Sequence, residues 1–152
     1  MEKVKTIILR KPQIFLLLTV FYILVLGILK WQLKPPWETL LYFLGGILGV
    51  YFMDIAEMIF DVKPSPFHSI VFVGLLTIVS FFVVTSSGNM LAIGLVLSLL
   101  FNMLLLLWFD WNSHKNLSSW YQVVDIVPSP RLQWWGMVLF GLLIVYMSII
   151  FI

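Results

Sequence analysis

The chain has no cysteine. Disulfides, thiolate metal sites and cysteine nucleophiles are therefore excluded. Charged residues are also scarce, because they make up only 11% of the 152 residues while apolar residues make up 62%. A typical soluble domain is about a quarter charged. So few charges cannot cover a water-soluble fold of this size, and lipid must be the solvent for most of the chain.

Several functional motifs are missing as well. The basic residues form no long run, so nucleic-acid binding is not indicated. The sequence contains no Gly-rich phosphate loop, no nucleophile elbow and no His-Glu-x-x-His pattern. These absences leave a membrane protein whose activity, if any, must reside in a few polar side chains.

Long apolar runs predict the fold class, an all-α polytopic transmembrane bundle with about five spans in a single domain, 1–152. Each run has about the ~20 residues that a bilayer core requires. Ser65-Pro66 and Ser129-Pro130 are typical of helix starts, and the last span follows a short amphipathic interfacial helix. The predicted spans are 13–33, 38–60, 66–84, 90–109 and 132–152, and the interfacial helix is 116–127.

The distribution of lysine and arginine predicts the orientation. With the N-terminus in the cytoplasm, seven basic residues fall on the inner side and Lys30 and Lys34 on the outer side. This positive-inside bias indicates a multi-pass protein of the inner (cytoplasmic) membrane, with the C-terminus outside. The basic residues near the N-terminus suit an anionic lipid surface, and we expect an uncleaved first span rather than a signal peptide.

The same orientation gathers the acids and histidines at the cytoplasmic boundary. Asp54, Glu57 and Asp61 are spaced to share one helical face, and His68 follows the intervening turn. Carboxylate and imidazole ligands suit Zn²⁺, Mn²⁺ or Mg²⁺, so Asp54, Glu57 and His68 are candidate ligands of a divalent metal. The alternative is that the acids are solvated at the interface and partnered by Lys63.

Two further residues are weaker candidates for the same metal. Asn102 lies deep in the fourth predicted span, where a hydrogen bond to a neighbouring helix is the commoner role. Asp110 comes at the end of that span, where a carboxylate is ordinarily solvated.

A glycine pair marks a packing face in the second span. Gly45 and Gly49 are four residues apart, which leaves a smooth helical surface that another helix can approach closely. Besides membrane lipids, we therefore expect a helix-packing partner, or a second copy in a homo-oligomer, through the Gly45/Gly49 face.

The central stretch resembles the bacterial inner-membrane family of membrane-bound metal-dependent hydrolases. The order is a Gly-rich span, Asp54-Ile-Ala-Glu57, a turn, His68-Ser69 and an apolar span, and the likeness covers roughly residues 40–110. In that family a later span carries a histidine and an acid, which the resemblance places at Asn102 and Leu106. This chain therefore departs from the pattern in half of the implied metal shell.

Three functions follow from these observations. We favour a non-catalytic, degenerate relative of these hydrolases, because Asn102 and Leu106 stand where ligands are expected. The second is an active divalent-metal hydrolase acting on a lipid or phosphoester through metal-activated water. The third is a small transporter with Asp54 as its titrating group, although neither an inverted repeat nor a broken helix supports it.

Overall fold

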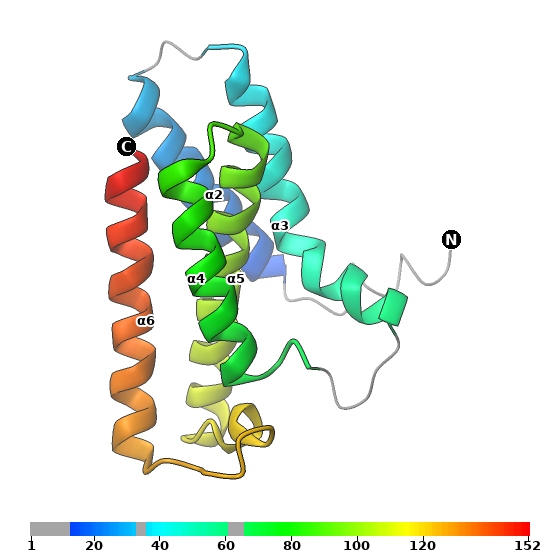
Figure 1. Cartoon of the computed structure of the whole chain (residues 1–152), viewed down its shortest axis with the longest axis vertical. Coiled ribbons are helices and arrows are strands. Elements are labelled where there is room, and N and C mark those ends of the chain that lie inside the picture. Colours follow the sequence, from blue (N-terminus) through cyan, green and yellow to red (C-terminus); the bar gives the residue numbers. More distant parts are fainter. Residues whose placement is uncertain (1–12, 33–35, 61–65) are drawn as a thin grey trace.

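A computed structural model describes residues 13–32, 36–60 and 66–152, and these residues form helices and no strands (Figure 1). The long helices are α2 (Gln13–Trp31), α3 (Glu38–Phe60), α4 (Ile70–Ser86), α5 (Met90–His114) and α6 (Pro130–Phe151). A single 3-10 turn, η1 (Ser118–Tyr121), lies between α5 and α6. The predicted all-α helical bundle is confirmed.

Four of these helices, α2, α3, α5 and α6, are long and apolar enough to cross a membrane. Their outward surfaces are covered with exposed leucine, isoleucine, valine and phenylalanine, as lipid-facing surfaces are. The helix α4 is shorter, with 17 residues and a length of about 25 Å. The chain is a polytopic membrane protein by length and composition, with four full spans and α4 at the lower limit of spanning length.

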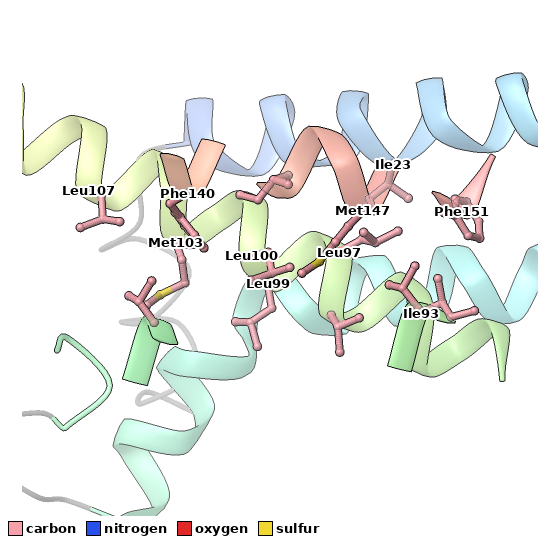
Figure 2. Packing of buried hydrophobic residues seen from close by; sticks show 14 of the residues in the cluster. Ile23, Ile93, Leu97, Leu99, Leu100, Met103, Leu107, Phe140, Met147 and Phe151 are labelled. Carbon is pink, nitrogen blue, oxygen red and sulfur yellow. The ribbon is translucent and has the colours of Figure 1, made fainter. Parts of the chain in front are cut away.

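The helix α5 is the centre of the bundle, and α2, α3, α4 and α6 all pack against it. Its inward residues Leu97, Leu100 and Met103 are completely buried. Figure 2 shows these side chains along α5, in a cluster that also contains Ile23 of α2 and Met147 of α6. Because α5 contacts every other long helix, a larger share of its residues is buried than in any of the other three spans.

The closest helix pair is α3 and α5, and glycines make the approach possible. A methyl group at Gly45 would overlap the carbonyl oxygen of Leu91, and one at Gly94 would overlap that of Tyr42. A methyl group at Gly49 would lie 2.9 Å from the Cβ of Ser98. The Gly45/Gly49 face is thus occupied by α5 of the same chain, while its use by another chain stays a prediction.

Two polar side chains cross this close interface. The Ser98 hydroxyl donates to the carbonyl of Gly46 at 2.6 Å, and the Asn102 amide nitrogen donates to that of Val50 at 3.3 Å. Both side chains are fully buried. Since lipid offers no alternative partners, such hydrogen bonds between helices satisfy groups that would otherwise be costly to bury.

Successive helices alternate in direction (Figure 1). The C-terminal ends of α2, α4 and α6 lie at one end of the bundle, and α5 ends at the other, near η1; α3 runs in the same direction as α5, and its last turns lean away from the bundle. At the first end, Lys30 donates to the carbonyl of Phe151 and lies 4.3 Å from the centroid of its ring. A cation there complements the negative end of α6.

Three predicted segments differ from the structure. The fourth span, predicted over 90–109, continues as helix to His114. Only Ser118–Tyr121 is helical within the interfacial helix predicted over 116–127. Its apolar spacing instead reflects buried Leu117 and Trp120, while Val123 and Val124 are exposed. The third span begins at Ile70 rather than at position 66, because Ser69 is the N-cap and its hydroxyl accepts from the backbone N–H of Phe72 at 3.2 Å.

Candidate functional site

The end of the bundle near η1 brings two predicted ligands together. His68 Nδ1 lies 2.9 Å from Glu57 Oε1, which links the last turns of α3 to the segment before α4. The two side chains are 41% and 34% exposed, respectively, so the pair lies at the surface of this end. A surface pair of this kind contributes little to the free energy of folding.

The Ser69 cap decides where His68 lies. The Ser69 hydroxyl donates to the carbonyl of Pro66 at 2.8 Å, which closes a turn just before α4. His68 therefore precedes the helix. The predicted helix start at Ser65-Pro66 had placed it in the first turn, which is wrong. In this position its ring reaches back toward Glu57 on α3.

Trp120 lies between this pair and α5. Its ring centroid is 5.3 Å from that of His68, with the ring planes 57° apart. Its indole N–H donates to Asp110 Oδ2 at 2.7 Å, and the side chain is 1% exposed. A hydrogen bond to a carboxylate is stronger than one between neutral groups, so this contact fixes η1 against the end of α5. Burial raises the pKa of the adjacent Tyr121, and its phenol stays protonated at neutral pH.

Gln133 forms two hydrogen bonds with the loop that connects α5 to α6. Its Oε1 accepts from the backbone N–H of Leu117 at 2.7 Å, and its Nε2 donates to the carbonyl of Pro128 at 2.9 Å. The side chain is 1% exposed. The sequence analysis did not single out this residue. The feature of the sequence that could have indicated it is a polar amide in the first turn of an apolar helix, because such a side chain needs a hydrogen-bond partner when it is buried.

Among the described residues, the candidate metal ligands do not converge on one point, because they form contacts in different parts of the structure. Glu57 and His68 meet, Asp110 bonds to Trp120, and Asn102 lies within the α3–α5 interface. Asp54 is half-buried on α3, and Asp61 lies outside the described residues. Across 13–32, 36–60 and 66–152, no three histidine, aspartate or glutamate side chains are close enough to hold a metal ion.

Asn102 has one unused group. Its Oδ1 is fully buried and has no hydrogen-bond partner among the described residues, and the same is true of the hydroxyls of Thr39 and Ser80. An amide oxygen can bind a cation or a water molecule. A lone ligand atom does not make a metal site, since divalent ions take four or more ligands.

Comparisons of the chain with protein-family models, with curated proteins and with solved structures found no match. The likeness to membrane-bound metal-dependent hydrolases thus stays a prediction from the Asp54–Glu57 and His68-Ser69 motifs.

Proposed function

We propose that this chain is a non-catalytic integral membrane protein whose polar side chains hold its helices and loops together. The observation that carries this proposal is the use of Asp110 and Asn102 in internal hydrogen bonds. Asp110 accepts from the buried indole of Trp120, and Asn102 donates across the α3–α5 interface. In a hydrolase of the suggested kind, the resemblance implies a metal ligand at Asn102, and Asp110 is a weaker candidate for holding the metal that activates water.

The distribution of polar groups supports the same conclusion. Within the described residues, Glu57 and His68 are in direct contact, and no group of three histidine, aspartate or glutamate side chains forms there. The residue four positions after Asn102 is Leu106, which offers no ligand atom. Asp110 and Gln133 at this end hold η1 and the loop between α5 and α6 in place.

One observation favours the second candidate, a divalent-metal hydrolase acting on a lipid or phosphoester. Metal-binding histidines commonly donate their other ring N–H to a carboxylate, which fixes the ring and its tautomer. The contact of His68 Nδ1 with Glu57 has this form. In this candidate His68 would bind Zn²⁺, Mn²⁺ or Mg²⁺ through Nε2, with Asp54 as a further ligand.

Metal analysis of the purified full chain separates the two candidates. We expect metal far below one ion per chain, and a thermal unfolding midpoint that neither EDTA nor added zinc or manganese shifts. His68→Ala is the test variant, and His114→Ala is the matched control, since His114 is exposed at the same end. Stoichiometric metal that His68→Ala removes and His114→Ala retains would overturn the non-catalytic proposal.

We also propose that the protein resides in the bacterial cytoplasmic membrane with the Glu57–His68 end on the cytoplasmic side. The seven-to-two distribution of basic residues supports this orientation. Reporter fusions to the chain test it. A C-terminal alkaline phosphatase fusion should be active and a C-terminal green fluorescent protein fusion dark, and the reverse pattern would invert the orientation.

A further inference from the structure

We infer that the ends of α5 and α6 form a binding site for the headgroup of an anionic phospholipid. The site consists of Trp108, Trp111, Trp134 and Arg131, which we call the α5–α6 patch. This inference concerns the lipid contacts of the protein and stands apart from the question of catalysis. It depends on the membrane location alone, and not on the orientation of the chain.

Three tryptophans meet in the α5–α6 patch. The ring of Trp134 lies 5.6 Å from that of Trp111 and 6.0 Å from that of Trp108. Trp108 and Trp111 are three residues apart and share a face of α5. Trp108 is 55% exposed, so part of the cluster is on the surface. Tryptophan rings of this kind concentrate at the level of the lipid headgroups.

Arg131 supplies the charge. It is exposed on the first turn of α6, three residues before Trp134, and so on the same side of the helix. Within the described part of the chain, Arg131 forms no ion pair and no side-chain hydrogen bond. The nearby acids do not serve as its partner, since Asp110 accepts from Trp120 and Asp125 makes no ion pair with a described residue.

The indoles offer further donors. Trp120 donates its N–H to Asp110, whereas Trp108, Trp111 and Trp134 donate to no described residue. An indole nitrogen is a donor only, and a guanidinium offers five donors that match a phosphate. The patch thus combines a fixed positive charge and hydrogen-bond donors with apolar rings at the ends of two spans, where we expect lipid phosphates. Phosphatidylglycerol complements it because its headgroup carries a net negative charge.

Lipid selectivity of the full chain tests the site. The protein is reconstituted in phosphatidylcholine bilayers that contain a trace of spin-labelled phosphatidylglycerol or spin-labelled phosphatidylcholine, and the motionally restricted fraction of each label is measured. We expect the wild type to prefer phosphatidylglycerol. Arg131→Gln should lower that preference about fivefold, the effect of one arginine at an anionic surface. Arg131→Lys keeps the charge without the planar fork, so its loss should be smaller.

Lys115→Gln is the matched control. Lys115 lies at the same end of the bundle, but its Nζ donates to Asn112 Oδ1 at 3.2 Å and it is not part of the α5–α6 patch. Its removal deletes the same charge and should leave most of the preference in place. Equal losses in Lys115→Gln and Arg131→Gln would overturn the site in favour of diffuse attraction. A wild type without preference would also overturn it, as would a change of oligomeric state in Arg131→Gln, which would indicate a protein interface.

Discussion

Replacing Gly94 by alanine tests the close approach of α3 and α5 directly. The added methyl group would overlap the carbonyl oxygen of Tyr42 and lie 3.1 Å from the backbone nitrogen of Gly46. Both of these atoms belong to the backbone of α3, so no side-chain rotation can make room. One helix must move away from the other, and the hydrogen bonds from Ser98 and Asn102 would lengthen with it.

The expected magnitude follows from two opposing effects. Alanine stabilises a helix interior by roughly 0.5–1 kcal/mol relative to glycine, because it loses less backbone entropy. Forcing an extra carbon into a packed interface costs about 1–3 kcal/mol. The comparison that isolates the second effect is Gly94→Ala against Gly136→Ala, since a methyl group at Gly136 meets no atom within 4 Å. The helix propensity then cancels to first order, and the full overlap cost of about 1–3 kcal/mol should separate the two variants.

Unfolding in mixed micelles by titration with sodium dodecyl sulfate measures this difference. We expect Gly94→Ala to unfold at a lower mole fraction of detergent than the wild type, and Gly136→Ala to unfold at the same or a higher one. Gly74→Ala is a second open-site control, on α4. If Gly94→Ala proves as stable as both controls, then α3 and α5 do not approach as closely as the glycine contacts require.

Three further variants test the polar contacts. Ser98→Ala removes the 2.6 Å hydrogen bond to Gly46 and should cost about 0.6 kcal/mol in the same detergent titration. Asn102→Leu removes a longer bond together with an unpartnered oxygen, so its effect should stay within about 1 kcal/mol; a much larger loss would indicate that Oδ1 binds a ligand. Trp120→Phe deletes the hydrogen bond to Asp110 and should accelerate hydrogen exchange in residues 115–129 without changing that of α3. If hydrogen exchange in residues 115–129 is no faster in Trp120→Phe than in the wild type, or if exchange in α3 increases equally, the bond does not have this role.

The long apolar runs were sufficient to predict the helices. The bounds of α3 match the prediction, and α2 and α6 differ from it by two residues at most. In lipid the backbone must form its own hydrogen bonds, so an apolar run of adequate length leaves few alternatives to a helix. Asp110 and His114 also lie on α5, because that helix ends only where Lys115 takes a left-handed conformation at φ 54°.

The loops were harder to predict because their contacts join residues that are distant in the sequence. The apolar spacing of Leu117 and Trp120 favoured an amphipathic helix, but these side chains are buried against the bundle. Gln133 then supplies a hydrogen bond to the backbone of Leu117 that a longer helix would have supplied itself. Only the folded chain brings these groups together.

The candidate site was predicted in part. Charge counting predicted that Glu57, His68 and Asp110 lie on one side of the membrane. In the structure Trp120 connects them, because His68 contacts both Glu57 and Trp120, and Trp120 bonds to Asp110. Spacing along the chain does not specify their partners. Trp120 lies between His68 and Asp110, and no periodicity in the sequence indicates that an indole separates the histidine from the carboxylate.

Four polar side chains form hydrogen bonds within the protein, two of them inside the bundle and two at its end. Inside the bundle, Ser98 and Asn102 donate to carbonyl oxygens of a neighbouring helix. At the end of the bundle, Asp110 and Gln133 bond to the loop that returns the chain from α5 to α6. Hydrogen bonds within the protein are therefore sufficient to explain why these polar residues occur in so apolar a chain. These four residues thus form hydrogen bonds within the protein, whereas the Glu57–His68 pair and the α5–α6 patch are partly exposed at its surface.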